Sequence, residues 1–427
     1  MEWLLKRLES FDRRAACIEA GHVWTYRDLL GSVRNAQQNL GAERIVPIES
    51  AHTFDSLSRL LALAATDKIA LPLAADIPGS ERSEMRRVAA DSPLHAKLKG
   101  SGLVLFSSGS SGKPKAMLHS LPALLDRYKN VPLRNDRTLQ LLLIDHIGGL
   151  DAALRCLCAG STLVVPAARD PDAAGEAIAK HKVNILPASP TFLNLMLLQG
   201  IPERYDCQSL EIIAYGAEPM PQTLLHRLGS AFPNLRLQQK FGTSETGAIR
   251  IESHDNGSLF FRIKDPDTEW KVIEDELWLK TPSLILGYIN AEDATLEADG
   301  WYRSGDLVEQ DDAGRLRIIG RRSDMINVGG RKVHPAEVEA VISQIKAVDS
   351  CRVYAEPDPI AGQRIACDLY SNSPMDLRGW KRTIRSHCLK ELAAWKIPSK
   401  IRLPEALSFT SRLKQKRSET RSGDETS

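Results

Sequence analysis

One loop of the sequence concentrates the residue types that bind phosphate groups. It reads Phe106-Ser107-Ser108-Gly109-Ser110-Ser111-Gly112-Lys113-Pro114-Lys115 and begins at the end of residues 103–106, an apolar run with the length of a buried strand. Its two glycines free the backbone to turn amides toward a ligand, while four serines add hydroxyl donors and two lysines add positive charge. Such a loop suits a polyphosphate. A flexible surface linker is the alternative, but the hydrophobic strand directly before the loop argues against it.

The spacing of this loop differs from that of a Walker A loop. Only two residues separate Gly109 from Gly112, and Pro114 stands where a Walker A loop has Ser or Thr. We expect a helical stretch after the loop. The sequence therefore predicts a phosphate site of another kind, placed between a buried strand and a helix.

The composition is that of a globular chain with a large core. Of 427 residues, 43% are hydrophobic and 26% are charged, which excludes a disordered, collagen-like or coiled-coil protein. The 56 Lys and Arg nearly balance the 54 Asp and Glu, so no overall field favours nucleic acid or a membrane as partner. No apolar run approaches the length of a membrane span. The first residues are amphipathic and charged, unlike a signal peptide.

The seven cysteines form no recognisable metal or disulfide pattern. Their number is odd, no pair has C-x-x-C spacing, and no His cluster completes a zinc site. Cys156 and Cys158 lie in an apolar stretch, where buried thiols are common. We predict structural cysteines and a reducing, cytoplasmic location.

Strand-length apolar runs alternate with helix-length amphipathic stretches through the first three hundred or so residues. The predicted buried strands are 103–106, 140–144, 162–165 and 210–214, and the predicted helices are 149–159, 171–181 and 190–198. This alternation predicts βαβ units and a mostly parallel sheet. From about 258 to 319, short strands with turn signals predict a small antiparallel layer.

The last hundred or so residues have the pattern of a separate unit. Pro335 begins a predicted helix whose apolar positions follow the i, i+3, i+4, i+7 spacing. Strands are predicted at 350–355 and 364–370, followed by a helix at 376–392. The polar segment 418–427 is predicted to be disordered.

The phosphate-type loop resembles that of the adenylate-forming superfamily, which includes acyl- and aryl-CoA synthetases, luciferases and adenylation domains of nonribosomal peptide synthesis. The match runs from Phe106 to Lys115, and only Ala116 departs, where the family usually has Gly. Further family-like motifs occur in the family's order along nearly the whole chain, at 24–29 before the loop and at 145–150, 215–220, 241–247, 301–307 and 320–324 after it. One motif could arise by chance, but the ordered series identifies the chain as a member.

The resemblance implies an α/β fold. Residues 1–320 would form a large N-terminal adenylation domain, with mostly parallel sheets flanked by helices and a small antiparallel β layer. Residues 321–417 would form a small, mobile α+β lid, and 418–427 a disordered tail. Only about a hundred residues precede the phosphate loop, so the N-terminal subdomain is expected to be shortened.

The resemblance also implies an ATP-dependent ligase with two half-reactions. A small carboxylic acid attacks the α-phosphate of ATP, which releases pyrophosphate and leaves an acyl-adenylate. A thiol then displaces AMP, and that thiol belongs to coenzyme A or to the phosphopantetheine of an acyl or aryl carrier protein. Charge builds on phosphate oxygens in the first step, so the site needs cations, Mg²⁺ and preorganised donors.

Several residues take nucleotide roles by this resemblance. Glu245 would ligate Mg²⁺, which takes one or two carboxylates. Phe241 would pack on adenine, although without the resemblance an aromatic there would more often belong to the core. Asp306 would accept both ribose hydroxyls, and Arg321 would reach the ribose or a phosphate. The full implied set is Ser107, Ser108, Gly109, Ser110, Ser111, Gly112, Lys113, Gly216, Ala217, Glu218, Phe241, Gly242, Thr243, Ser244, Asp306 and Arg321.

Three residues take catalytic roles by the same resemblance. Lys115 would hold the phosphates, and Lys414 is the candidate lysine of the C-terminal domain. The segment from Thr410 keeps the family's Thr-to-Lys spacing but has Leu413 in place of Gly, and Lys416 is close enough to compete. His146 would line the acid pocket, with a buried structural histidine as the alternative.

Two alternatives stay open. Asp145 next to the His-x-x-Gly element leaves room for an amino-acid or aryl-acid adenylation enzyme that loads a carrier protein. The departures at Ala116, Ser323 and Leu413 leave room for a weakened protein that only binds ATP or an acyl-adenylate, with Ser323 at the expected hinge. Against the second alternative, all five separated charged groups of the expected site are present in the sequence. They are Lys115, Glu245, Asp306, Arg321 and Lys414.

Overall fold

The computed structural model describes residues 2–50, 53–90, 92–107, 114–292 and 295–404. Its largest sheet has seven strands, and every pair except β1–β2 is parallel. The order is β11 (Arg236–Gln239), β10 (Ile212–Tyr215), β9 (Ile185–Ala188), β7 (Arg137–Leu139), β8 (Thr162–Val164), β1 (Ala15–Glu19) and β2 (His22–Thr25). The connecting helices are α6 (Ile147–Ala159), α7 (Pro171–His181), α8 (Pro190–Leu198), α9 (Ile201–Arg204) and α10 (Gln222–Ala231). The predicted parallel α/β layer is confirmed.

The predicted strand at 140–144 is wrong. The strand ends at Leu139, and Gln140 turns back so that its side-chain amide donates to the Leu142 carbonyl oxygen at 2.9 Å. Leu141 and Ile144 are fully buried because they pack into two hydrophobic clusters, although neither pairs within the sheet. The predicted strand at 210–214 begins two residues later, at Ile212, whereas the helices predicted at 171–181 and 190–198 have the predicted bounds.

A second sheet carries the predicted phosphate loop. Its order is β18 (Gly287–Tyr288), β6 (Lys115–Ser120), β5 (Gly102–Ser107), β4 (Ile69–Leu73) and β3 (Ile45–Glu49), with β3, β4 and β5 parallel and the rest antiparallel. The stretch after the loop is therefore a strand, and the predicted helix there is wrong. Lys115-Ala116-Met117-Leu118 has good helix propensity, but pairing with β5 on one side and β18 on the other overrides it.

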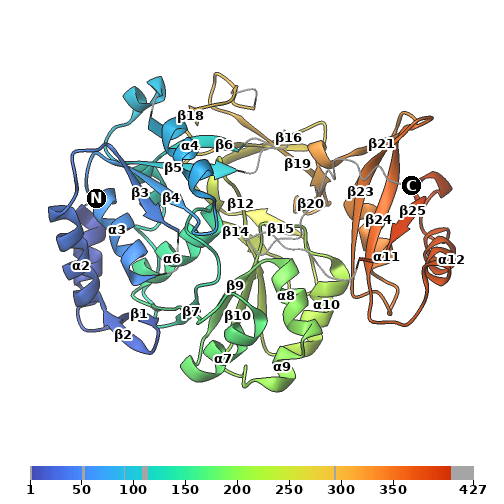
Figure 1. Cartoon of the computed structure of the whole chain (residues 1–427), viewed down its shortest axis with the longest axis horizontal. Helices are drawn as coiled ribbons and strands as arrows, with labels where there is room; N and C mark the ends of the chain where they lie inside the picture. Colours follow the sequence, from blue (N-terminus) through green and yellow to red (C-terminus); the bar gives the residue numbers. More distant parts are fainter. Residues whose placement is uncertain (1, 51–52, 91, 108–113, 293–294, 405–427) are drawn as a thin grey trace.

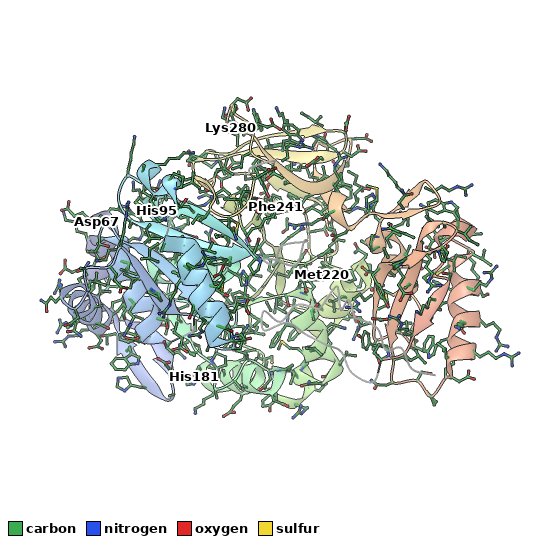
Figure 2. All side chains as sticks on the ribbon, turned by 45° about the horizontal axis from the view of Figure 1, so that its top comes forward. Asp67, His95, His181, Met220, Phe241 and Lys280 are labelled. Carbon is green, nitrogen blue, oxygen red and sulfur yellow. The ribbon has the colours of Figure 1, made fainter. Side chains whose placement is uncertain are left out.

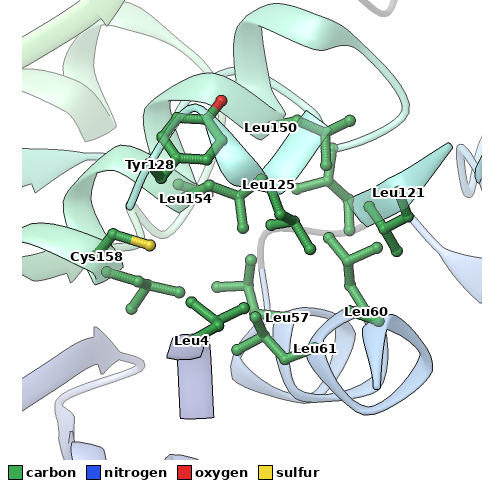
Figure 3. Close-up of a cluster of buried hydrophobic side chains, with 14 of the residues drawn as sticks. Leu4, Leu57, Leu60, Leu61, Leu121, Leu125, Tyr128, Leu150, Leu154 and Cys158 are labelled. Carbon is green, nitrogen blue, oxygen red and sulfur yellow. The ribbon is translucent and has the colours of Figure 1, made fainter. Parts of the chain in front are cut away.

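Helices α1 (Glu2–Glu9), α2 (Tyr26–Gln38), α3 (Phe54–Ala64), α4 (Gly79–Ala90) and α5 (Leu121–Asp126) accompany these two sheets. Figure 3 shows leucines of α1, α3, α5 and α6 meeting in one apolar cluster, with Leu4, Leu61, Leu125 and Leu154 among them. Each fully buried leucine contributes about 1.5–3 kcal/mol relative to exposure. The cluster therefore fixes α6, which carries part of the candidate site, against the N-terminal helices.

A six-stranded antiparallel sheet follows, as predicted, although it begins earlier than expected. Its order is β14 (Ile251–Ser253), β15 (Phe261–Ile263), β20 (Leu316–Arg321), β19 (Tyr302–Gln310), β17 (Glu276–Lys280) and β16 (Glu269–Ile273). A short hairpin of β12 (Phe241–Thr243) and β13 (Gly247–Ile249) precedes it in the chain.

The C-terminal unit lies at one end of the molecule, coloured orange to red in Figure 1. Its sheet contains β22 (Arg331–Val333), β21 (Ile326–Val328), β24 (Gly362–Tyr370), β23 (Ser350–Asp358) and β25 (Lys400–Arg402), with helices α11 (Pro335–Ile342) and α12 (Leu377–Cys388). Short 3-10 helices cover Pro93–Lys97, Arg322–Asp324 and Ala394–Lys396. The unit has its own hydrophobic core around the buried Trp380.

Two further observations concern the chain as a whole. All seven cysteines are free thiols, and Cys156 and Cys158 are buried on α6 as predicted. In the described part of the chain, no helix combines the length and apolar character that crossing a bilayer requires. The predicted tail at 418–427 lies outside the described residues.

Candidate functional site

The ends of the phosphate-type loop are held together by a strand pair. Ser107 closes β5 and faces Lys115 at the start of β6 in the antiparallel register. The side-chain amide of Asn290 fixes this end further, since its Oδ1 accepts from the Ala116 N–H at 2.8 Å and its Nδ2 donates to the Pro114 carbonyl oxygen at 2.9 Å. The predicted loop residues Ser108, Gly109, Ser110, Ser111, Gly112 and Lys113 lie outside the described residues.

The candidate metal ligand, Glu245, lies beside the end of this loop. Tyr288 of β18 donates its hydroxyl to Glu245 Oε1 at 2.9 Å, and the Lys115 ammonium lies 5.3 Å from the centre of the Tyr288 ring. Tyr302 of β19 hydrogen-bonds the side chains of both Glu245 and Thr243. Burial raises the pKa of Tyr302 well above its usual range, so its phenol stays protonated. Two tyrosine hydroxyls thus orient one carboxylate.

The turn that presents Glu245 is shaped by its neighbours. The Thr243 hydroxyl accepts from the Glu245 and Thr246 backbone N–H groups at 3.2 and 3.1 Å. A Cβ at Gly242 would lie 2.3 Å from the Gly247 carbonyl oxygen, so the hairpin of β12 and β13 needs glycine there. Ser244 precedes Glu245 and lies against the fully buried His119 of β6, whose pKa burial lowers to about 4.

Asp306 and Arg321 form the candidate ribose site on neighbouring strands. They are paired in the register of β19 and β20, and Arg321 Nε lies 2.9 Å from Asp306 Oδ1. Asp306 is 5% exposed, and burial raises the pKa of its carboxyl, with Arg321 opposing the rise. The charge of Glu245 acts on both residues, which places all three in one electrostatic environment.

The predicted adenine-flanking segment follows β10. Gly216 packs closely against the next strand end, since a Cβ there would lie 2.7 Å from the Lys240 carbonyl oxygen. Ala217 adopts a φ of +68°, which is uncommon for a residue with a Cβ. Glu218 accepts from the Thr191 backbone N–H at 3.2 Å, in the first turn of α8.

Phe241 lies in the core of the antiparallel layer. It is 8% exposed and stacks on Phe261, with ring centres 5.6 Å apart. Figure 2 shows Phe241 and Met220 in the middle of the molecule. Of the two interpretations of this aromatic, the structure shows the core packing directly, and the adenine contact stays a prediction.

His146 occupies the N-cap position of α6. Its Nε2 lies 3.9 Å from Asp145 Oδ1, and the Asp145 backbone N–H donates to Ser50 Oγ at 3.0 Å. The side chain of His146 is 21% exposed. The residue therefore stands at the positive end of a thirteen-residue helix, which favours a nearby anion.

The third catalytic candidate, after Lys115 and His146, is Lys414. It lies outside the described residues.

We predict that Gly149→Ala destabilises the protein by about 2 kcal/mol or more, because a Cβ there meets backbone that cannot move aside. That Cβ would lie 2.0 Å from the Leu143 carbonyl oxygen. The matched control is Gly148→Ala, whose nearest neighbour is a leucine methyl 3.6 Å away, and it should change stability by less than about 0.5 kcal/mol. Thermal unfolding of both variants tests this, and equal melting temperatures would contradict it.

Comparison with known families decides the identity of the fold. The sequence model of the family described as AMP-binding enzyme matches residues 42–289. The sequence model of the family described as AMP-binding enzyme C-terminal domain matches residues 337–414. The chain belongs to the AMP-binding enzyme family. The resemblance to the adenylate-forming superfamily is thereby confirmed.

Related AMP-binding enzymes include named CoA ligases. The chain is 30% identical over 319 residues, or 71% of its length, to a 3-[(3aS,4S,7aS)-7a-methyl-1,5-dioxo-octahydro-1H-inden-4-yl]propanoyl:CoA ligase of Mycobacterium tuberculosis, of which 62% is covered. It is 29% identical over 322 residues to a 2-succinylbenzoate–CoA ligase of Geobacillus, with 70% of this chain and 64% of that protein covered. The chain spans about three fifths of the length of the curated relatives it matches.

Solved structures of adenylating enzymes share the fold of this AMP-binding enzyme. The anthranilate CoA ligase AuaEII with anthranoyl-AMP has a TM-score of 0.83 at 20% identity, with 96% of this chain and 95% of that chain covered. The o-succinylbenzoate CoA synthetase of Bacillus subtilis with its acyl-adenylate has a TM-score of 0.78 at 20% identity, with 99% and 98% covered. At this identity the likeness concerns the fold alone.

The sequence analysis of this AMP-binding enzyme missed three residues of the candidate site. Tyr288 and Asn290 lie outside every motif, and Tyr302 lies inside the motif at 301–307, where only Asp306 was given a role. A usable signal existed for Tyr302, since alternate residues of a strand share a face and Tyr302 is four residues before Asp306. No local signal pointed to Tyr288.

Proposed function

We propose that the protein is an ATP-dependent acid–thiol ligase that forms AMP. It adenylates a small carboxylic acid and passes the acyl group to the thiol of coenzyme A or of a carrier protein's phosphopantetheine. The observation that carries the proposal is the grouping of Glu245 with Lys115, through Tyr288, and with the Asp306–Arg321 pair, beside the strand end at which the phosphate-type loop finishes. The named CoA ligases among the relatives support the same reaction class.

ATP would bind with its phosphates at the loop and its ribose at Asp306. Lys115 and Ser107 stand at the two ends of the loop and would contact the phosphates. Asp306, when ionised, is a hydrogen-bond acceptor only, and two acceptor oxygens suit two ribose hydroxyls. Arg321 would reach the ribose or a phosphate. Phe241, Gly242, Thr243 and Ser244 on one side and Gly216, Ala217 and Glu218 on the other would flank the adenine.

Glu245 is the proposed Mg²⁺ ligand. In the described part of the chain, no three His, Cys, Asp or Glu side chains gather into a metal cage. A single oriented carboxylate nevertheless fits Mg²⁺, which usually takes one or two carboxylates and its remaining oxygens from phosphates and water. The ion would neutralise charge on the phosphates when bound. Tyr288 and Tyr302 would hold the carboxylate in place for it.

The acid would approach along α6. His146 at its N-cap would line the acid pocket, and the partial positive charge of the helix end favours a carboxylate.

The second half-reaction brings in a phosphorylated pantetheine that carries the thiol. The exposed Arg331 and Lys332 of β22 would meet its phosphate. Ser323, also exposed, is the proposed pivot between the two half-reactions, and Lys414 the proposed catalytic lysine of the first.

The test is pyrophosphate release from Mg-ATP with a panel of aryl, fatty and amino acids. We expect acid-dependent release that falls at least tenfold in Lys414→Ala, while Lys416→Ala stays near wild type, because one well-placed cation contributes this much to a phosphoryl-transfer step. The reverse order of the two variants would move the catalytic role to Lys416. Thermal stabilisation by ATP with no release from any acid would overturn the ligase and favour a binding protein.

A further inference from the structure

A second charged cluster lies on α6, apart from the carboxylates of the nucleotide site. Asp151 and Arg155 are one turn apart on this helix, and Arg155 Nη2 lies 3.2 Å from Asp151 Oδ1. Tyr128 donates its hydroxyl to the same oxygen at 3.0 Å. Figure 3 shows the Tyr128 ring against the leucine cluster, with its hydroxyl pointing away from the apolar side chains. The Asp151 carboxylate is thus already held by two donors.

Lys240 adds a second positive charge to this cluster. It lies at the end of β11, where its backbone N–H donates to the Tyr215 carbonyl oxygen at 2.7 Å. The charged groups that act on its ammonium are Asp151 and Arg155 of α6 and Arg236 of its own strand. Lys240 and Arg155 are two cations near the single carboxylate of Asp151, and Arg236 is a third cation on the strand. This group therefore has an excess of positive charge. Within the described residues, the Lys240 ammonium makes no hydrogen bond or ion pair.

An unpaired ammonium in this setting is unfavourable. Burial lowers the pKa of Lys240 to about 8, Arg155 and Arg236 push in the same direction, and Asp151 opposes them. Lys240 is half-buried, so its ammonium is partly shielded from water and can still be reached by a ligand. An anion that reached Lys240 would restore the interaction that the folded chain does not supply.

Lys240 adjoins two of the segments proposed to flank the adenine. Lys240 immediately precedes β12, whose hairpin presents Glu245, and it contacts Gly216 at the neighbouring strand end. Asp151 and Arg155 of the cluster lie on α6, the helix that has His146 at its N-cap. None of the charges acting on Lys240 is Glu245, Asp306 or Arg321. A ligand at the carboxyl ends of β10 and β11 would lie beside this ammonium. Ligands bind at such carboxyl ends of parallel strands.

Resting on the proposed function, we propose that Lys240 binds a second, non-reacting carboxylate of the acid, so that the substrates are dicarboxylates. One carboxylate reacts with ATP, and the other pairs with Lys240 at the far end of the pocket. Asp151 keeps Arg155 in place and prevents it from competing for the same anion. The acid pocket would then discriminate by charge at a point distant from the reaction.

The experiment compares acids that differ only in the distal charge. Terephthalate and 4-carbamoylbenzoate form one pair, and adipate and its monoamide form another. We expect wild type to favour the diacid of at least one pair by about tenfold or more in kcat/KM, the worth of one charge-assisted hydrogen bond. In Lys240→Met this ratio should collapse toward one. Lys264→Met removes an exposed lysine of the antiparallel layer and should keep the wild-type ratio.

The outcomes separate the inference from the proposed function. Turnover of acids with no preference for either diacid, or a preference that survives in Lys240→Met, overturns the inference and leaves the ligase standing. Silence with every acid overturns the ligase. In that case calorimetric binding of terephthalate to wild type and to Lys240→Met still decides the inference, since equal affinities, or no binding to either, contradict it.

Discussion

Replacing Glu245 with Gln is expected to reduce acid-dependent pyrophosphate release by roughly 10²–10³-fold, the usual cost of removing one electrostatic group from such a site. The substitution keeps the size of the side chain and keeps an oxygen that can accept from Tyr288, so the local structure should persist. It removes the negative charge that a hard cation requires. Raising the Mg²⁺ concentration should not restore the rate, and a magnesium titration of both proteins measures this.

Tyr288→Phe is the matched control for this prediction. It removes the 2.9 Å hydrogen bond to Glu245 Oε1 but leaves the carboxylate charge in place. We expect at most about a tenfold loss, because a hydrogen bond to a charged group contributes about 1.5–3 kcal/mol when fully buried and Glu245 is only half-buried. A rate for Glu245→Gln within threefold of wild type, or a greater loss in Tyr288→Phe than in Glu245→Gln, would contradict the metal role.

The two tyrosines around Glu245 show where sequence reasoning ends. Motif spacing predicted Glu245 and Asp306 because each lies in a short segment with a recognisable pattern. Tyr288 reaches Glu245 from 43 positions further along the chain, through the pairing of β18 with β6. That pairing depends on two sheets meeting, and no local periodicity encodes it. Lys240 was missed for a related reason, since its environment is set by Asp151 and Arg155 on a distant helix.

The fold was predictable where burial and local signals agree. The helices α7 and α8 begin at a proline and carry buried apolar residues, and both were predicted with their bounds. The prediction failed where tertiary packing decides the backbone. Residues 115–120 form β6 because two strands pair with them, and residues 140–144 leave the sheet although they are apolar. The parallel layer and the antiparallel layer were nevertheless both predicted from the change in pattern along the chain.

Asp306→Asn is expected to weaken ATP binding by roughly 10–100-fold, since charge-assisted hydrogen bonds contribute about 1.5–3 kcal/mol each. The same change should not lower the melting temperature at neutral pH. Burial raises the pKa of Asp306 in the folded protein, so ionised Asp306 costs folding free energy above that pKa, and the cost disappears as pH falls through it. Asparagine removes this cost at every pH. Calorimetric titration with ATP and thermal unfolding at pH 7 measure the two effects.

Arg321→Gln is expected to have the opposite effect on the stability of the protein, and it completes the test of the ribose site. It leaves the 5%-exposed Asp306 carboxylate without its partner at 2.9 Å, so the pKa of Asp306 should rise further. We expect a loss of about 1–2 kcal/mol of stability at pH 8, moderated because Arg321 is half exposed. The loss should shrink as the pH falls and the carboxyl, whose pKa burial raises, takes up a proton. If Asp306→Asn is instead as unstable as Arg321→Gln and binds ATP normally, then the buried carboxylate is a structural partner of Arg321 and the ribose role is wrong.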